Sequence, residues 1–315
     1  MDRFEDRTVF QTREWLEFLR HTQRAEPVVC RLARGSELAG YFTGAVVRRY
    51  GVRILGSPFP GWTTAYMGFN LRAGESRVEA AQALLRYAFG PLRCAHVELR
   101  DRELGEADAN ELGGSVEHFT SFEIDMRPSE GDLFNGMSSA CRRCVRKAER
   151  SGVTVEQASD AGFADEYFAQ LEDVFAKQNL RPTYGVERVR ALIDHVQPSG
   201  RLLLVRARAP DGRCIATALY PAHGRSMHFW GGASWRSDQI LRPNEAIFWF
   251  AMRYWKARGV ETFDLGGGGD YKRKYGGSEV AVPHVIRSRV PGLMPLRAAA
   301  ERVYGVGGLR RLIGR

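Results

Sequence analysis

The chain of 315 residues is long enough for one large domain or for two domains of ordinary size. Its hydrophobic content of 44% and aromatic content of 11% are typical of a globular protein and exclude an intrinsically disordered one. The formal net charge of +9 favours contact with phosphates, nucleic acid or an anionic membrane surface. The alternative is that the arginine-rich composition serves only to keep the protein soluble.

The five cysteines form no recognisable metal site or disulfide framework. Cys141 and Cys144 make a C-x-x-C motif, but no second pair and no histidine lies at zinc-like spacing, so we expect both to be small residues on a helix. No run reaches the roughly 18 apolar residues that a membrane span needs, and the N-terminus is charged from its start. These features predict a cytoplasmic protein without a metal site.

The first half of the chain predicts a helix, three strands, a second helix and a fourth strand. Apolar residues recur at helical spacing in residues 12–21 and again in residues 75–89. The runs that predict strands span residues 27–34, 38–49, 52–59 and 95–101.

The second half repeats this order of elements. Helical periodicity precedes three strand-like runs, which are joined by tight turns, and a long apolar helix and a last strand follow. That helix has Pro243 near its start and Gly259 at its end, and we expect it to be almost fully buried. The predicted helices span residues 163–178, 186–196 and 243–259, and the predicted strands span residues 201–209, 214–222, 226–233 and 261–266.

This repeated order predicts an α/β (α+β) fold with two tandem domains, each a mixed, mostly antiparallel sheet flanked by helices. In each half the two strands around the helix are expected to be parallel through a right-handed crossover, while the meander is antiparallel. A turn-rich stretch places the boundary near residue 126, so the domains are residues 1–126 and 127–287. The apolar, basic segment 288–315 either packs on the first domain or lies on an anionic membrane surface.

Three segments resemble the Fem-type (FemAB- and FemX-like) aminoacyl- and peptidyltransferases of the GNAT N-acyltransferase superfamily. Residues 138–156 resemble the family's basic helix and the Gly-Val-x-Val strand after it. Residues 228–266 resemble its strand, loop, buried helix and final strand, and residues 270–277 its closing loop, in which an aromatic residue and a lysine precede an aromatic residue and glycine. The first half of the chain resembles the family only in the order of its predicted helices and strands.

The resemblance implies two tandem GNAT-like domains and N-acyl transfer. Its best-known members move an amino acid from aminoacyl-tRNA to an amine of a peptidoglycan precursor. It therefore implies a bacterial cell-wall transferase in the cytoplasm, either soluble or peripheral at the inner face of the membrane. Such transfer needs an activated ester or thioester, a deprotonated amine and donors for the oxyanion. It needs no nucleophilic serine or cysteine, and the chain has no G-x-S-x-G motif.

The glycine-rich loop after the last predicted strand is the first candidate site. The resemblance implies that Lys272 contacts phosphate of the acceptor or charge near the transfer centre, and Lys274 is a second candidate for substrate contact. Gly267 and Gly268 lack the Cβ that would keep a ligand from the end of the strand. Asp264 is a candidate to orient Lys272 or to take a proton from the incoming amine. The alternative is a solvated basic turn.

The helix of residues 142–150 presents cations along nearly one whole face. A bound polyanion such as tRNA, a diphosphate-linked sugar or anionic lipid would relieve their mutual repulsion, and the expected contacts are Arg143 and Lys147. The alternative is an exposed surface helix with a few carboxylate partners.

Three further residues are candidates for substrate binding. The resemblance implies that Tyr184 faces the donor or acceptor cleft, although it needs no explanation beyond ordinary packing. Trp230 is expected mainly as a core aromatic of the sheet. Asn244 either caps the long apolar helix, which is the favoured interpretation, or contacts ligand.

The identity of the acyl donor can be inferred from residues 234–246, which lie between the last meander strand and the long helix. CoA-dependent GNAT proteins usually carry a Q/R-x-x-G-x-G/A loop here, whose amides hold the pyrophosphate at the start of the helix. This segment has no glycine. We therefore expect aminoacyl-tRNA rather than acyl-CoA as the donor, and no cofactor. The alternatives are an acyl-CoA-dependent N-acyltransferase of polysaccharide or natural-product assembly, and a non-catalytic module that binds nucleic acid or membrane.

Overall fold

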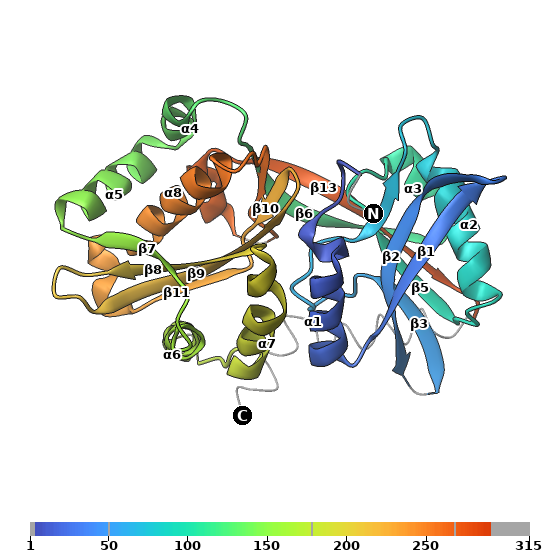
Figure 1. The fold of residues 1–315 in the computed structure, drawn as a ribbon, viewed down its shortest axis with the longest axis horizontal. Coiled ribbons are helices and arrows are strands. Elements are labelled where there is room, and N and C mark those ends of the chain that lie inside the picture. Colours follow the sequence, from blue (N-terminus) through green and yellow to red (C-terminus); the bar gives the residue numbers. More distant parts are fainter. Residues whose placement is uncertain (1–3, 50, 178, 268, 291–315) are drawn as a thin grey trace. The chain divides into compact units, whose positions relative to one another are not determined.

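The computed structural model describes residues 4–290 except residues 50, 178 and 268, and the chain divides into two compact units (Figure 1). Unit 1 runs to Thr120 and takes up the chain again at Ala281, while unit 2 spans Ser121–Val280. The boundary expected after residue 126 thus falls inside unit 2. Residues 291–315, which were expected to pack on the first domain or to bind membrane, lie outside the described residues.

Unit 1 is built on a three-stranded antiparallel meander, β1, β2 and β3. Strand β5 pairs with β3 in parallel, and the C-terminal part of β13 pairs with β5 in antiparallel orientation. Its elements in chain order are η1 (Val9–Gln11), α1 (Arg13–Gln23), β1 (Glu26–Arg34), β2 (Glu37–Arg49), β3 (Val52–Ser57), β4 (Gly68–Leu71), α2 (Arg77–Phe89), β5 (His96–Arg100), α3 (Glu106–Glu111), the first part of β6 (Ser115–Asp125) and the last part of β13 (Ser278–Ser288).

The core of unit 1 lies between its sheet and α2. Val97 and Leu99 alternate along β5 on one face of the sheet and belong to the same buried cluster as Leu84 and Leu85 of α2. Helix α2 begins where the side chain of Ser76 accepts a hydrogen bond from the backbone of Glu79, a standard N-cap. Helix α2 belongs to the crossover connection between the parallel strands β3 and β5, and these contacts fix it against the sheet.

Unit 2 has a sheet in the order β6, β12, β10, β9, β8, β7, with β11 paired to β9. Its elements, after the end of β6, are α4 (Glu130–Gly136), α5 (Ser139–Arg150), β7 (Thr154–Ala158), α6 (Phe163–Ala176), α7 (Val186–Val196), η2 (Gln197–Ser199), β8 (Leu202–Arg208), β9 (Cys214–His223), β10 (Ser226–His228), β11 (Gly231–Ser234), η3 (Arg236–Leu241), α8 (Pro243–Lys256), β12 (Thr262–Asp264), η4 (Asp270–Tyr275) and the start of β13.

The two faces of the unit 2 sheet differ in character. Helices α5 and α8 cover one face and bury an apolar core that includes Met227, Phe263 and Trp255 (Figure 1). Helices α6 and α7 lie on the other face, where Gln170 of α6 accepts a hydrogen bond from Thr217 of β9. Because side chains alternate along a strand, the neighbours of the core residues on β10 and β12 belong to this second, more polar face.

The structure confirms the predicted internal repeat in its order of main elements, and it confirms the tandem mixed-sheet fold. In unit 1, β3 pairs with β5 while β4 returns to pair with β2. In unit 2, β10 pairs with β12 while β11 returns to pair with β9. The single strand predicted at residues 226–233 is therefore two strands. Helix α8 is mostly buried as predicted, but Arg253 and Lys256 leave one edge polar. Among the described residues, no helix is both long and apolar enough to cross a membrane.

Candidate active site

In unit 2 the strands β10 and β12 separate immediately after a short parallel pairing. The last paired register joins His228 to Asp264, and the amide of Phe229 then donates to the carbonyl of Asp264 at 2.9 Å. Beyond this point β11 turns to β9, and the amide of Leu265 donates to Phe122 on β6 at 2.8 Å. We call the edge of β11 that faces away from β9 the seam. In the described chain β11 pairs with β9 through its other edge. The backbone N–H and C=O groups along the seam are therefore suited to bind a ligand.

The equivalent position in unit 1 is closed by side chains. The amide of Phe69 on β4 donates to Oδ2 of Asp101 at 2.6 Å, and the amide of Gly68 donates to Oγ of Ser57 at 2.7 Å. Arg77 donates to both oxygens of Asp101 at 3.0 Å. Gly68 has a φ of +74°, and a Cβ there would lie 2.3 Å from the Asp101 carboxylate. Of the two equivalent positions in the repeat, the seam of unit 2 is therefore the better candidate for a ligand-binding site.

A polar cluster on the second face lies where the seam begins. Oγ of Ser121, on β6, donates to Oδ1 of Asp264, and the amide of Gly266 donates to the same oxygen at 2.7 Å. Nδ1 of His228 lies 3.6 Å from Oδ2. Burial alone would raise the pKa of Asp264, but His228 and the hydrogen bonds outweigh it and lower the pKa. Asp264 is thus a buried carboxylate held in its ionised form.

Lys272 is buried beneath the glycine-rich loop and does not extend into solvent. Its Nζ donates to three backbone carbonyls, those of Leu265 at 2.5 Å, Gly266 at 2.9 Å and Gly267 at 2.8 Å. An ammonium group has three N–H donors, and all three are engaged. Burial lowers the pKa of Lys272 to about 8, against the opposing charge of Asp264. Its position next to the candidate site agrees with the prediction, but its contacts assign it to holding the loop rather than to binding phosphate.

The other two cations of this loop are also engaged within unit 2. Nζ of Lys274, predicted to contact substrate, forms an ion pair of 2.7 Å with Oε1 of the buried Glu245. Arg273 pairs with Glu279 at 2.5 Å and lies over the ring of Phe122. Each of the three consecutive cations thus has internal partners of its own. A phosphate group would have to displace one of them.

The start of α8 differs from the prediction. Asn244 does not cap the helix, because the N-cap residue is Arg242 and no side chain makes a capping hydrogen bond. Instead, Nδ2 of Asn244 donates to Oγ of Ser234 at 3.1 Å and ties β11 to the helix. Pro243 supplies no amide hydrogen at the first helical position. The carboxylate of Glu245 occupies the first turn, where the positive end of the helix dipole favours a negative charge.

The structure brings two predicted aromatic residues together at the beginning of β11. The rings of Tyr184 and Trp230 lie 5.4 Å apart, and the hydroxyl of Tyr184 is 2.8 Å from that of Tyr167 on α6. A Cβ on Gly231 would lie 2.4 Å from the Tyr167 hydroxyl, so only glycine permits this approach. Burial raises the pKa of both tyrosines, which keeps them as neutral hydroxyls. The indole Nε1 of Trp230 is buried and has no hydrogen-bond partner in the described structure.

Helix α5 presents its cations on the side away from the core. Arg143 is exposed and Lys147 is half-buried, and neither has an ion pair within the described part of the chain. Arg142 instead donates to the carbonyls of Asn135 and Met137, at 2.6 and 2.5 Å. Arg143 and Lys147 are thus the available cations that the sequence predicted. Of the two glycines predicted at the site, Gly267 accepts from Lys272, and Gly268 lies outside the described residues.

The cysteine prediction is consistent with the structure. Cys141 is buried on α5 with its Sγ 3.8 Å from Sδ of Met137, and burial raises the pKa of its thiol to about 12. Cys144 is a partly buried neighbour on the same helix. Within residues 4–290, apart from the three gaps, no group of histidine, cysteine and acidic side chains is placed to hold a metal ion.

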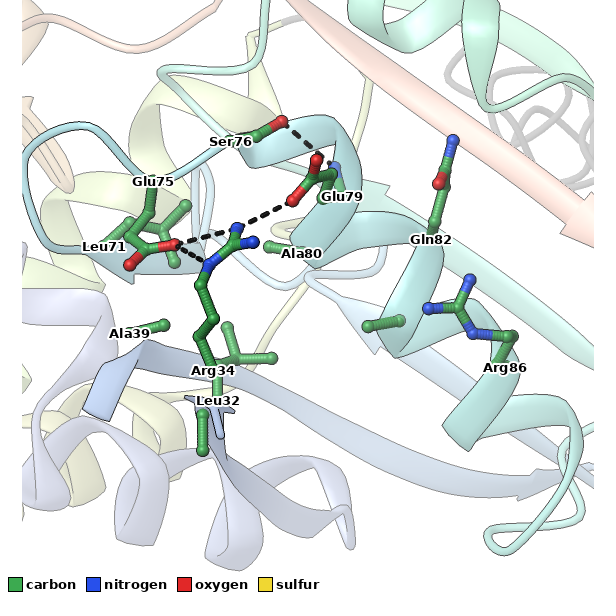
Figure 2. Close-up of a pocket in the computed structure, with 12 residues that line it drawn as sticks. Leu32, Arg34, Ala39, Leu71, Glu75, Ser76, Glu79, Ala80, Gln82 and Arg86 are labelled. Carbon is green, nitrogen blue, oxygen red and sulfur yellow. Dashed lines mark hydrogen bonds and ion pairs between the residues drawn. The ribbon is translucent and has the colours of Figure 1, made fainter. Parts of the chain in front are cut away.

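A separate hollow of about 290 Å³ lies in unit 1 between α2 and the strands β1, β2 and β4 (Figure 2). Arg34 crosses it from β1 and pairs with Glu75 at 3.2 Å and Glu79 at 2.7 Å. Leu32 and Leu71 lie among its apolar lining. None of the described residues predicted for the site lines this hollow, which belongs to unit 1.

Comparison with known proteins identifies the class of unit 2. Residues 137–274 match the family model described as an acetyltransferase (GNAT) domain. Unit 2 carries a GNAT acyltransferase domain. No curated protein is similar in sequence. The GNAT assignment confirms the predicted superfamily and places the protein among the acyltransferases.

Solved structures extend the likeness to both units. The crystal structure of FemX is similar with a TM-score of 0.75 at 14% identity, over 95% of this chain and 97% of that chain. The C-terminal domain of a putative lysylphosphatidylglycerol synthetase from Agrobacterium fabrum has a TM-score of 0.56 at 13% identity, over 88% and 89% of the two chains. A tandem GNAT protein from the clavulanic acid biosynthesis pathway has a TM-score of 0.50 at 11% identity, over 88% and 94%. These structures confirm the predicted tandem GNAT, Fem-like fold.

Sequence reasoning missed His228 and Ser121 as members of the site. Alternation along the strand indicated that His228 shares a face with Trp230, but it gave no reason to connect His228 with Asp264. That connection depends on the register between β10 and β12. Ser121 joins the cluster through β6, a strand that the sequence pattern did not predict.

Proposed function

We propose that the protein transfers an aminoacyl or acyl group to an amine of a cell-envelope precursor of the peptidoglycan type. The observation that carries the proposal is the seam of unit 2, with the His228–Asp264 pair at its base and the Tyr184–Trp230 pair beside it. Acyl transfer needs a place for the acyl donor next to hydrogen-bond donors and a proton acceptor. The seam would provide these in a GNAT domain, and the closure of the matching position in unit 1 supports this choice.

Aminoacyl-tRNA is the acyl donor that we favour over acyl-CoA. The pyrophosphate of CoA would meet the start of α8, where Pro243 supplies no amide hydrogen and the buried carboxylate of Glu245 carries negative charge. Lys274 forms an ion pair with that carboxylate and is therefore not available to bind a phosphate. An aminoacyl ester does not need a pyrophosphate cradle at this helix. The donor would then be a polyanion, and Arg143 and Lys147 are available cations in the same unit.

The proposed acceptor is a component of the cell envelope. The chain is similar in fold to FemX and to the C-terminal domain of a putative lysylphosphatidylglycerol synthetase. The second name contains a phosphate-bearing lipid, phosphatidylglycerol, and a net charge of +9 suits an anionic acceptor of this kind. We propose a cytoplasmic protein that meets this acceptor in solution or at the inner membrane face.

Each side chain at the seam has a proposed part in the transfer. We assign the indole N–H of Trp230 and the hydroxyl of Tyr184 to the carbonyl oxygen of the acyl group, because both are donors held in a largely dry site. Lys272 fixes the carbonyls of the loop at the end of β12. The attacking amine would approach from the side of Asp264.

A transfer assay tests the proposal directly. The full chain is incubated with a nucleotide-linked peptidoglycan precursor that carries a free amine, together with either radiolabelled aminoacyl-tRNA or radiolabelled acetyl-CoA. We expect label to reach the precursor from aminoacyl-tRNA and not from acetyl-CoA. Transfer from acetyl-CoA alone would support the acyl-CoA-dependent alternative. If neither donor reacts with any amine supplied, while RNA or anionic vesicles still bind, the protein is a binding module and the proposal is wrong.

A further inference from the structure

We propose that His228 is the general base of the transfer reaction and that Asp264 is the residue that positions its ring; this inference rests on the proposed function. His228 occupies the last paired position of β10, directly opposite Asp264 of β12. The strands separate immediately afterwards, at Phe229. The backbone of His228 thus lies at the closed end of the seam.

The carboxylate of Asp264 lies beside the buried imidazole of His228. Its Nδ1 faces Oδ2 of Asp264 at 3.6 Å, while the other carboxylate oxygen is fixed by Ser121 and by the amide of Gly266. A carboxylate on Nδ1 directs the proton of the neutral ring to that nitrogen and leaves Nε2 as the acceptor. The pair is buried, so that this charge interaction is not weakened by bulk water.

The other titratable groups nearby are less suited to the task. The pKa of Asp264 is lowered by His228 and its hydrogen bonds despite burial, so the carboxylate is a weak base near neutral pH. Lys272 uses all three of its N–H donors on backbone carbonyls. Tyr167 and Tyr184 have raised pKa values because they are buried, and both stay protonated. Near neutral pH, imidazole is the side chain that exchanges a proton most readily.

In the transfer the acceptor nitrogen loses two protons and gains one bond to carbon. The acceptor ammonium gives one proton to Nε2 of His228 and becomes a neutral amine. Its nitrogen forms a bond to the carbonyl carbon of the aminoacyl ester, and the bond from that carbon to the ester oxygen breaks. The leaving oxygen departs with a second proton from the nitrogen, which gives the amide and a free hydroxyl group. His228 then returns its proton to water.

The experiment compares His228→Gln with the wild type on two kinds of acceptor. The first is an ordinary alkylammonium acceptor, and the second is hydroxylamine, which is already neutral at pH 7 and needs no base. For the alkylammonium acceptor we expect kcat to fall by about 10²–10⁴-fold and to lose its dependence on pH at the acid side. For hydroxylamine we expect a loss of less than about tenfold, because binding and oxyanion stabilisation remain. Asp264→Asn should reduce kcat more than it changes KM.

His284→Gln is the matched control, since His284 is an equally buried histidine on a strand of unit 1. Its activity should stay within about twofold of the wild type on either acceptor, if unit 1 takes no part in proton transfer. His228→Asn provides a second variant if His228→Gln does not fold, as judged by thermal unfolding.

The outcomes separate the two proposals. An active wild type whose His228 variants keep their kcat and pH profile, or lose equal activity with both acceptors, overturns the assignment of the base and leaves the transferase proposal intact. A wild type that transfers to neither acceptor contradicts the proposed function itself, and the assignment of His228 with it.

Discussion

Lys274 and Glu245 form an ion pair of 2.7 Å at the first turn of α8, which is the place where a GNAT domain that uses CoA would hold a pyrophosphate. The carboxylate is buried, and the lysine reaches it from η4, the turn that follows the glycine-rich loop. Two segments far apart in the chain are thus joined by opposite charges. This pair links the conformation of the loop to the helix that supports the seam.

Removing Lys274 should destabilise unit 2, because it leaves the charge of Glu245 buried without a partner. We expect Lys274→Ala to lower the free energy of unfolding by about 2–4 kcal/mol, measured in urea at pH 7. The double variant Lys274→Met/Glu245→Gln should recover most of this loss, since no charge is then buried. Equal stability of Lys274→Ala and wild type would mean that the ion pair has no such part.

Much of the fold was predictable because each helix and strand of the two meanders carries its own hydrophobic period. The strand predicted at residues 226–233 was the exception, since its break at Phe229 and Trp230 depends on pairing with β9 and β12. Strands β4, β6 and β13 were not predicted. Strands β6 and β13 run beside strands of a mixed sheet, and their partners are far away in sequence.

The sequence indicated some residues of the candidate site, but it missed His228 and Ser121 and could not give the contacts. Sequence reasoning selected Asp264, Lys272, Tyr184 and Trp230, and the structure places each of them around the end of β10 and β12. It could not tell that the cations of the loop have internal partners, because a run of lysine and arginine has the same composition whether it faces carbonyls, carboxylates or solvent. Only the packing of α8 and η4 against one another settles this.

Gly231 is expected to tolerate no side chain. In Gly231→Ala the new Cβ would lie 2.4 Å from the hydroxyl of Tyr167, so we expect a loss of about 1–3 kcal/mol in unfolding free energy, together with reduced activity. The double variant Gly231→Ala/Tyr167→Phe should regain part of the stability, because the clashing atom is then absent. Gly136→Ala is the control, since nothing lies within 4 Å of a Cβ at that position. A change of less than about 0.5 kcal/mol for Gly231→Ala would contradict the close approach.

Lys272 should make the stability of the protein depend on pH in the alkaline range. Burial lowers its pKa in the folded state to about 8, from an ordinary value of 10.5. Between these values the unfolded chain binds the proton that the folded chain has lost, so stability rises with pH by up to about 1.4 kcal/mol per unit. We expect the unfolding free energy of wild type, relative to Lys272→Met, to increase from pH 8 to pH 10. A difference that stays flat or falls over this range would show that Lys272 keeps its charge in the fold.

Charge reversal on α5 should weaken substrate binding without changing the chemical step. Arg143 and Lys147 have no ion pair within the described structure, and they lie on the side of α5 away from the apolar core. We expect Arg143→Glu/Lys147→Glu to raise KM for the polyanionic substrate by at least tenfold at low salt and to leave kcat within about threefold, with the difference shrinking as salt rises. Arg48→Glu/Arg49→Glu, which reverses two exposed cations of unit 1, is the matched control and should leave both parameters near wild type. If both double variants raise KM equally, net charge rather than the surface of α5 governs binding, and the assignment of Arg143 and Lys147 is wrong.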